Sequence, residues 1–267
     1  MNELISGSSF SKWSQRLQAA FFLGGRVVYH LLTGKVDRRN TIEQMITVGP
    51  ESLIIALVIS GSIGMIFTIQ IAREFLRLGA GSAVGGILAV ALSRELAPIL
   101  TAVVVAGRVG SAYAAEIGTM RVTEQIDALY MLKTDPVDYL VVPRVVACCL
   151  MMPALSILAL FTGMAGGVFI SQALFGISPP VFLDSAKSLL DVWDVLSGPI
   201  KASIFGALIA IIGCSWGMTT SGGAKGVGQS TTASVVTALL AIFIADFVLS
   251  WVMFQGVGSA GLKGFSF

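Results

Sequence analysis

Residues 83–106 read AVGGILAVALSRELAPILTAVVVA, an apolar run in which Arg94 and Glu95 are the only charged residues. A helix needs about 20 mostly apolar residues to cross the hydrocarbon core of a bilayer. A helix also satisfies its own backbone hydrogen bonds, which lipid cannot do. This stretch therefore predicts a transmembrane helix in an all-α integral membrane protein.

The composition of the whole chain agrees with this prediction. Of 267 residues, 55% are hydrophobic and only 12% are charged, and the mean hydropathy is +0.87. A soluble domain has about 25% charged residues. Apolar windows of membrane-spanning length predict five transmembrane helices, at residues 52–72, 83–106, 145–171, 199–220 and 234–255.

The distribution of Lys and Arg predicts how the chain is oriented. Eleven of these residues fall on the side of the membrane that holds the N-terminus, and five, with Lys201 counted among them, fall on the other. Connections rich in Lys and Arg stay in the cytoplasm. The N-terminus is therefore predicted to be cytoplasmic, and the C-terminus, after an odd number of spans, to lie outside.

The chain is predicted to be one integral domain preceded by an amphipathic region. Residues 1–51 form that N-terminal region and residues 52–267 the five-span domain, with a cytoplasmic connection at 107–144 and an outside connection at 172–198. Large apolar residues recur at helical spacing before the first span, namely Phe10, Trp13, Leu17, Phe21, Val28 and Leu31. This stripe is typical of a helix in the membrane surface, or of one packed on the protein's own spans.

Several functional classes are disfavoured by the residues present. A net charge of +2 with scattered basic residues gives no reason to expect nucleic-acid binding. His30 is the single histidine, and the three cysteines, Cys148, Cys149 and Cys214, lie in apolar runs without a CxxC spacing. They are interpreted as small buried hydrophobic residues, and no metal site or disulfide is expected.

The sequence also lacks a nucleotide-binding or catalytic motif. The segment TTSGGAKGVGQSTT at 219–232 is rich in glycine, but Lys225 follows Ala224 and precedes Gly226, whereas a P-loop requires Gly-Lys-Ser or Gly-Lys-Thr. We interpret it as a short cytoplasmic turn whose small residues allow something else to approach. The chain is expected not to be an enzyme.

Three ionisable residues fall inside predicted spans: Arg94, Glu95 and Asp246. Such a residue at the centre of a membrane helix costs about 2.5–3.5 kcal/mol on insertion scales and marks a transport pathway by default. A fixed structural ion pair is the alternative interpretation. Asp246 is the expected partner of Arg94, and Pro98 is expected to allow a kink because it lacks a backbone N–H.

A short helix is predicted in the cytoplasmic connection, from Thr123 to about Leu132. Thr123 is the expected N-cap, and the acidic residues Glu124 and Asp127 suit the first turn. Four apolar residues line one face of this helix: Val122, Ile126, Leu129 and Leu132. Asp135 and Pro136 are expected to start the next helix. The short helix is either a docking element for a soluble partner or a solvated loop helix.

Three stretches resemble the MlaE-type permeases, the membrane subunits of ABC lipid transporters that work with MCE-domain proteins. They are RELAPILTAVVVAGRVGSAYAAEIGTMRVTEQIDALYML at 94–132, GVGQSTTASVV at 226–236 and ADFVLSWVMF at 245–254. The resemblance implies a homodimer that binds two copies of a cytoplasmic ATPase and meets an MCE-domain lipid-binding protein on the far side. It implies phospholipid as cargo and no cofactor in this chain, ATP being bound by the ATPase.

The same resemblance assigns roles to individual residues. It makes 107–144 the coupling segment, with a docking helix that carries Glu116, Arg121, Glu124, Gln125 and Asp127. Arg94 and Glu95 match the family's intramembrane charged pair. The cavity of the dimer would be lined mainly by apolar residues of the first, second and fifth spans.

The first hypothesis is therefore the permease subunit of an ATP-driven phospholipid transporter, in a bacterial inner membrane or an organelle envelope. A self-sufficient ion-coupled carrier that uses Arg94, Glu95 and Asp246 is the alternative, since intramembrane ionisable groups suggest a relay. The absence of an inverted repeat disfavours it. A membrane scaffold is the third hypothesis.

Overall fold

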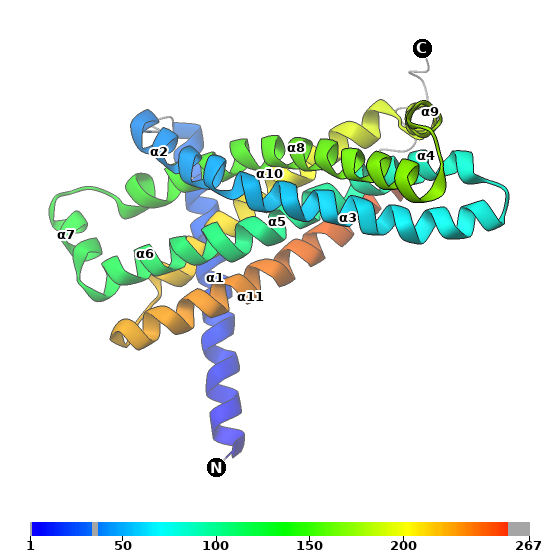
Figure 1. The fold of residues 1–267 in the computed structure, drawn as a ribbon. Coiled ribbons are helices and arrows are strands. Elements are labelled where there is room, and N and C mark those ends of the chain that lie inside the picture. Colours follow the sequence, from blue (N-terminus) through cyan, green and yellow to red (C-terminus); the bar gives the residue numbers. More distant parts are fainter. Residues whose placement is uncertain (1, 34–36, 256–267) are drawn as a thin grey trace. The chain divides into compact units, whose positions relative to one another are not determined.

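The computed structural model describes residues 2–33 and 37–255, with side chains over 13–30 and 37–254. The described part is helical and contains no strand, which confirms the predicted all-α class (Figure 1). Phe10 and Leu31 of the predicted N-terminal stripe lie outside the described side chains, and the predicted position of the C-terminus concerns residues outside the described range.

Within the described residues, five helical stretches are long and apolar enough to cross a membrane, which agrees with the number predicted. They cover Arg38–Arg77, Gly81–Val122, Val137–Phe175, Val192–Met218 and Gly223–Phe254. The first contains α2 (Arg38–Val48) and α3 (Pro50–Arg77), and the third contains η4 (Val137–Val141) and α8 (Val142–Phe175). The fourth is α10 (Val192–Met218), and the fifth contains α11 (Gly223–Ser250) and η5 (Trp251–Gln255). Each stretch is longer than its predicted window, although the fourth and fifth end at Met218 and Phe254, slightly before the predicted ends at 220 and 255.

The second span is the most irregular. A 3-10 turn, η1 (Gly81–Ala83), opens it, and two π-helical turns, η2 (Leu92–Leu96) and η3 (Ala106–Gly110), interrupt it. They separate α4 (Val84–Ala91), α5 (Ala97–Val105) and α6 (Ser111–Val122). Single π turns inside α-helices occur frequently at functional sites, and η2 contains the intramembrane charges predicted above.

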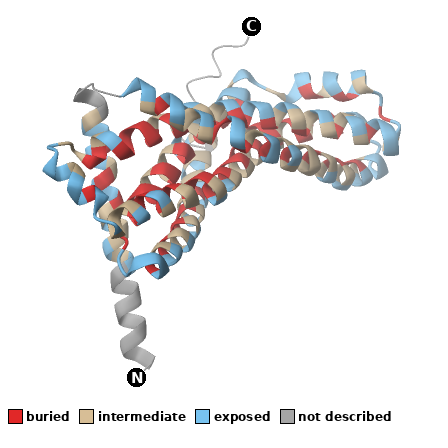
Figure 2. Cartoon of the chain, turned by 60° about the vertical axis from the view of Figure 1, so that its left-hand side comes forward, coloured by how far each residue is buried: buried red, intermediate tan, exposed pale blue. Residues whose placement is uncertain are grey.

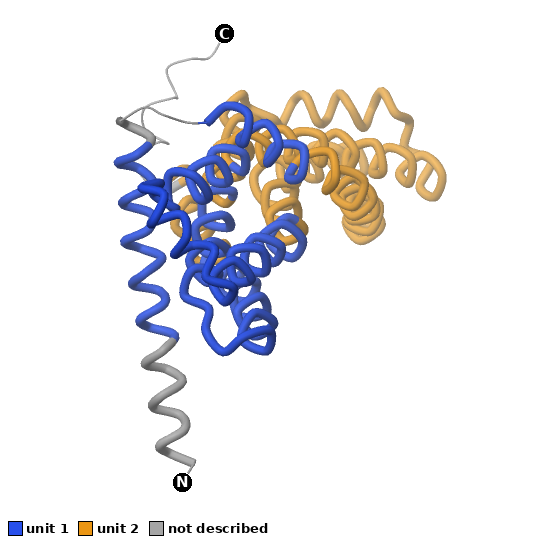
Figure 3. The backbone as a smooth tube through the Cα atoms, turned by 90° about the vertical axis from the view of Figure 1, so that its left-hand side faces the viewer, with its two compact units in different colours: residues 1–48, 105–148, 206–241 blue, residues 49–104, 149–205, 242–267 orange. Residues whose placement is uncertain are grey.

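The chain divides into two compact units (Figure 3). Unit 1 comprises residues 1–48, 105–148 and 206–241, and unit 2 comprises 49–104, 149–205 and 242–267.

In unit 2, pairs of helices pack closely because glycines allow their backbones to come into direct contact. A Cβ atom added to Gly64 of α3 would lie 2.0 Å from the carbonyl oxygen of Gly163 in α8. Membrane helices associate through such small residues, because burial of large apolar groups gains little in lipid. Fully buried Leu88, Leu92 and Phe182 fill the space beside this crossing.

The helix α9 (Pro179–Leu189) packs on α4 in the same manner. A Cβ atom at Gly85 would lie 2.0 Å from the carbonyl oxygen of Phe182. The neighbouring Gly86 donates its backbone N–H to Ser185 Oγ at 3.1 Å. The Gly85–Gly86 pair therefore allows direct contact between the two helices.

Unit 1 contains α1 (Asn2–Thr33), which packs on its own unit through a narrow stripe. Ala20, Leu23 and Val27 are buried, whereas Phe21, at 83% exposure, and Val28 are exposed. Buried residues of the chain are red in Figure 2, and exposed ones are pale blue. The large apolar residues predicted as the interacting stripe thus lie largely on the outer face. The packed face carries Ala20, Leu23 and Val27, and the outer face is suited to contact with lipid.

The short helix that was predicted between the second and third spans begins later than predicted. The structure has α7 at Gln125–Met131, and Thr123 closes α6 instead of capping α7, because its N–H and Oγ1 both donate to the Thr119 carbonyl. Glu124 separates the two helices at a φ of 61°. The start of the next helix is confirmed, since Asp135 Oδ1 accepts the Val137 N–H at 2.9 Å.

The predicted apolar face of α7 is only partly buried. Ile126 is buried and Leu129 half-buried, but Leu132 is 74% exposed. The glycine-rich segment also differs from the prediction: only residues 219–222 form a turn, and α11 begins at Gly223. Gly222 and Gly223 both have positive φ, which glycine adopts without strain.

Candidate functional site

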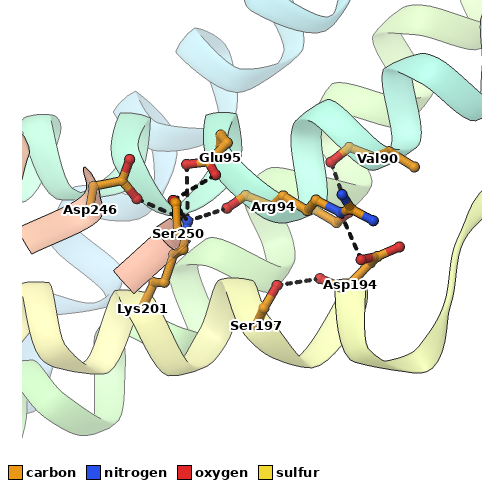
Figure 4. Close-up of polar contacts among 9 residues, drawn as sticks. Val90, Arg94, Glu95, Asp194, Ser197, Lys201, Asp246 and Ser250 are labelled. Carbon is orange, nitrogen blue, oxygen red and sulfur yellow. Dashed lines mark hydrogen bonds and ion pairs between the residues drawn. The ribbon is translucent and has the colours of Figure 1, made fainter. Parts of the chain in front are cut away.

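The candidate site is a cluster of charged side chains in unit 2, inside the membrane-spanning helices (Figure 4). Arg94 and Glu95 lie in η2, Lys201 lies in α10, and Asp246 and Ser250 lie in α11. The cluster therefore joins the second, fourth and fifth spans.

Pro98 explains why a backbone carbonyl of η2 can accept a hydrogen bond from the charged cluster. A proline has no N–H, so it cannot bond the carbonyl four or five residues before it. These are the carbonyls of Arg94 and Ser93. Lys201 Nζ donates to the Arg94 carbonyl at 3.0 Å, and a Cβ at Gly198 would lie 2.5 Å from the Ser93 carbonyl oxygen. The two freed carbonyls thus both face α10.

Lys201 is the centre of the cluster, and its side chain has an exposure of 0%. Besides the Arg94 carbonyl, its ammonium group donates to Glu95 Oε2 at 3.0 Å, Asp246 Oδ1 at 3.0 Å and Ser250 Oγ at 2.7 Å. An ammonium group has three N–H donors, so at least one N–H is shared between acceptors. Two carboxylates balance the buried cation, as a charge away from water requires.

Ser250 closes a ring within this cluster. Its hydroxyl donates to Glu95 Oε1 at 2.8 Å and accepts from Lys201 at 2.7 Å. Both oxygens of Glu95 are therefore engaged, and its carboxylate is fixed in orientation.

Arg94 makes a second ion pair beside the first. Its Nε donates to Asp194 Oδ1 at 2.7 Å, and its guanidinium group lies 4.5 Å from the centroid of the Phe254 ring. Asp194 is 2% exposed and also accepts the Asp191 N–H through Oδ2 at 3.2 Å. A buried carboxylate thus holds a guanidinium group that is itself 37% exposed.

The cluster therefore exposes one cation, Arg94, and one anion, Glu95, and each forms an ion pair with a buried residue of opposite charge. Arg94 at 37% and Glu95 at 38% exposure are accessible, whereas Lys201 and Asp194 are buried. Adjacent accessible charges of opposite sign in an apolar helix can contact a polar group that enters the membrane. They can do so without being displaced, because their buried partners hold them.

The predicted residues are brought together, but the predicted pairing is wrong. Arg94, Glu95 and Asp246 all belong to the cluster, yet Arg94 pairs with Asp194, and Asp246 pairs with Lys201. Sequence reasoning missed Asp194 and assigned Lys201 to the outside connection, although Lys201 falls inside the predicted window 199–220. The usable signal was the seven-residue spacing of Asp194 and Lys201, which places both on one face of a helix.

Unit 1 contains the five residues assigned to coupling, and they do not form a single cluster. Arg121 Nη1 donates to Asp127 Oδ1 at 2.7 Å, which links the end of α6 to α7. Glu124 and Gln125 are exposed between them. Glu116 lies earlier on α6 and faces α8.

Glu116 forms an ion pair with a buried arginine. Arg144 Nη2 donates to Glu116 Oε2 at 2.9 Å, and Nη1 donates to the Leu140 carbonyl at 2.8 Å. The guanidinium carbon lies 5.2 Å from the ring centroid of Tyr113, which is fully buried. Arg144 of α8 thus joins α8 to α6 through its contacts with Glu116 and Tyr113, and α7 lies between these two helices in the sequence.

The α1 helix is tied to the segment that follows α7. Arg26 Nη2 lies 2.8 Å from Asp135 Oδ2, and His30 Nδ1 lies 2.8 Å from Asp138 Oδ1. Asp135 therefore caps the third span through one oxygen and binds α1 through the other.

Comparison with known proteins shows which family of proteins this chain resembles. The family model described as Permease MlaE matches residues 41–252. A probable ABC transporter permease protein of Synechocystis sp. is 63% identical over 262 residues, which is 98% of this chain and 100% of that protein. Protein TRIGALACTOSYLDIACYLGLYCEROL 1, chloroplastic, of Arabidopsis thaliana is 52% identical over 256 residues, 94% of this chain and 73% of that protein. A probable ABC transporter permease protein of Rickettsia prowazekii is 39% identical over 214 residues, 80% of this chain and 83% of that protein.

Proposed function

Because the chain belongs to the MlaE permease family, we propose that it is the membrane subunit of an ATP-driven transporter whose cargo is phospholipid. The name of the Arabidopsis relative contains a galactolipid, which supports a lipid cargo. The chain acts as a transport subunit and not as an enzyme. It requires no cofactor of its own.

The exposed pair Arg94 and Glu95 is the observation that carries this proposal. A phospholipid has an anionic phosphate and apolar chains, so its transport needs a polar contact inside an apolar path. Arg94 can bind the phosphate, since guanidinium groups match phosphate geometry. Glu95 lies beside it and can contact a cationic or hydroxyl-bearing headgroup. Asp194 and Lys201 hold the two side chains in place.

The energy comes from a separate cytoplasmic ATPase, since the sequence has no P-loop. The ATPase docks on α7 and on the charged residues around it, namely Glu116, Arg121, Glu124, Gln125 and Asp127. The Arg121–Asp127 ion pair fixes α7 on α6, and the Glu116–Arg144 ion pair joins α6 to α8. A displacement of α7 is therefore passed to the second and third spans.

The assembled transporter is a homodimer that meets an MCE-domain lipid-binding protein on the far side. Its exposed apolar residues on α11, such as Phe243 and Phe247, suit acyl chains or a second copy. The connection 107–144, which contains α7, lies in the cytoplasm with the N-terminus, and the C-terminus lies outside. Relatives from a cyanobacterium and a chloroplast fit a bacterial inner membrane or an organelle envelope.

An ion-coupled carrier is a second candidate, favoured by the hydrogen-bonded chain from Asp246 through Lys201 to Glu95. Such a chain of ionisable groups resembles the proton relays of membrane pumps. In this case a proton gradient, and not ATP, would drive transport.

Reconstitution distinguishes the two candidates. The chain is placed in liposomes with the ATPase that co-purifies with it, and transfer of a fluorescent phospholipid is measured with ATP or with an imposed proton gradient. We expect ATP-dependent transfer that falls at least tenfold in Arg94→Gln, with Arg77→Gln as control because Arg77 is exposed outside the cluster. Transfer driven by the gradient without an ATPase would favour the carrier, and no transfer under either condition would contradict both.

A further inference from the structure

Unit 1 contains a groove that the proposed transport path does not use. It has a volume of about 690 Å³ and lies between Trp13 of α1 and the first turns of α11. Four exposed residues of α11 line its length at helical spacing, namely Lys225, Gly228, Thr232 and Val236. The segment 219–232 that resembled a nucleotide loop thus forms part of its wall.

The inner part of the groove is apolar and fixed. Ala233 and Val236 line it together with the Trp13 ring, whose Nε1 donates to Thr237 Oγ1 at 3.3 Å. The residues of α11 that line the groove run from Ala224 to Thr237, and thirteen steps of about 1.5 Å give a length of about 20 Å. Half the hydrocarbon thickness of a bilayer is about 15 Å, so the length suits one acyl chain together with its headgroup.

The outer end of the groove is cationic. Lys225 lines the groove itself, and Gln229 joins it to a second pocket of about 420 Å³ that contains Arg16. Arg16 donates only long hydrogen bonds, to Ser230 Oγ and the Thr219 carbonyl, each at 3.4 Å. Among the residues with described side chains, neither Arg16 nor Lys225 forms an ion pair with a carboxylate.

We propose that this groove binds an anionic phospholipid of the leaflet on the α7 side of the membrane. The acyl chain would lie along Ala233 and Val236, and the phosphate would lie between Arg16 and Lys225. The Trp13 ring would contact the acyl chain, because it lines the inner part of the groove and is fixed there by its hydrogen bond to Thr237. Arg16 and Lys225, which have no carboxylate partner among the described side chains, select an anionic lipid over a neutral one through their charge.

This site is distinct from the cluster around Lys201, because all of its lining residues belong to unit 1. Its occupant would hold α1 against α11 and would not be the transported molecule. Its test needs neither ATPase nor ATP, so failure of the site and failure of the proposed transport function are separate results.

The test is photo-crosslinking in nanodiscs that hold the full chain alone. Phosphatidylglycerol and phosphatidylcholine probes, each with a diazirine on the acyl chain, are compared, and labelled peptides are mapped by mass spectrometry. We expect phosphatidylglycerol to label residues 224–237 preferentially. Each unpaired cation near a headgroup contributes about fivefold in affinity, so Arg16→Gln/Lys225→Gln should weaken labelling about 25-fold. Lys187→Gln, an exposed lysine on α9, should not.

A second variant fills the groove instead of changing its charge. A Cβ at Gly228 meets nothing within 4 Å, so Gly228→Leu should fold and should abolish labelling by both probes. Equal labelling by both probes, unchanged by Arg16→Gln/Lys225→Gln, would overturn the proposal. Labelling mapped outside 224–237 would also overturn it. Disulfide formation between two Gly228→Cys copies, with loss of lipid labelling, would show instead that a second copy occupies the groove.

Discussion

Replacing Lys201 by methionine should destabilise the protein more than any exposed charge substitution. Methionine preserves most of the side-chain volume but removes the cation that binds Glu95 and Asp246. Removing one partner of a buried ion pair costs about 3–5 kcal/mol, since the remaining charge is buried without compensation. Glu95 is 38% exposed and can regain water, so we expect the lower limit, about 3 kcal/mol.

A thermodynamic cycle tests the origin of this loss. Lys201→Met, Asp246→Asn and the double variant are compared by reversible unfolding in mixed micelles, followed by tryptophan fluorescence. If an uncompensated carboxylate causes the loss, Asp246→Asn should cost less in the Lys201→Met background than in the wild type, by about 1–2 kcal/mol. Lys187→Met, at an exposed position on α9, is the control and should change stability by less than about 0.5 kcal/mol.

Two outcomes would refute this reasoning. A loss below about 0.5 kcal/mol for Lys201→Met would mean that the ammonium group does not compensate the carboxylates. Strict additivity in the cycle would mean that Lys201 and Asp246 do not interact, in spite of the 3.0 Å distance between Nζ and Oδ1.

Three further substitutions test other contacts. Gly64→Ala should cost about 1–3 kcal/mol in the same unfolding assay, because its Cβ would lie 2.0 Å from a backbone oxygen of the facing helix; an equal effect of Gly107→Ala, where a Cβ meets nothing within 4 Å, would contradict this explanation. Asp194→Asn should release Arg94 and reduce ATP-driven lipid transfer several-fold while the ATPase still co-purifies; unchanged transfer would show that the ion pair does not position Arg94. Asp135→Ala should cost about 1 kcal/mol as a lost helix cap and should loosen α1, measured as faster hydrogen exchange near Arg26; unchanged exchange would contradict the tie between α1 and the third span.

The membrane spans could be predicted because each is a local property of the chain. A window of about 20 apolar residues is sufficient evidence of a span, and all five predicted windows overlap spans of the structure. The partners of the intramembrane charges are not local. Arg94 and Asp194 are 100 residues apart, and Glu95 and Lys201 are 106 apart. Helical periodicity gives the face of each residue within its own helix, but not which helix it meets.

The start of α7 illustrates a conflict between local signals. Thr123 is a good N-cap by type, and acidic residues follow it, so the sequence favours a helix start there. The same hydroxyl can also bond back to the carbonyl four residues earlier. In the structure Thr123 Oγ1 donates to the Thr119 carbonyl at 2.8 Å, and α6 ends there. Neither signal is stronger from sequence alone.

The packing of α1 reverses a rule that holds for soluble proteins. In water the large apolar stripe of a helix faces the protein, because burial removes it from solvent. In lipid a large apolar side chain needs no protein partner, and close helix contact favours small residues. Ala20 therefore faces unit 1 while Phe21 faces outward. The sequence left open whether the stripe contacts the membrane or the protein's own spans; in the structure Phe21 is exposed, whereas Trp13 of the same stripe bonds Thr237 of α11.

Pro98 connects the local and the long-range parts of the site. A proline inside an apolar span predicts a kink, and the structure has the π turn η2 directly before Pro98. Its consequence at the site depends on α10: the carbonyl that Pro98 leaves unpaired must find another donor inside the membrane, because an unsatisfied carbonyl there costs several kcal/mol. Lys201 supplies that donor at 3.0 Å. The same lysine that neutralises Glu95 and Asp246 therefore also donates a hydrogen bond to the carbonyl that Pro98 cannot bond, so the buried cation connects the local effect of the proline to the charges of the fifth span.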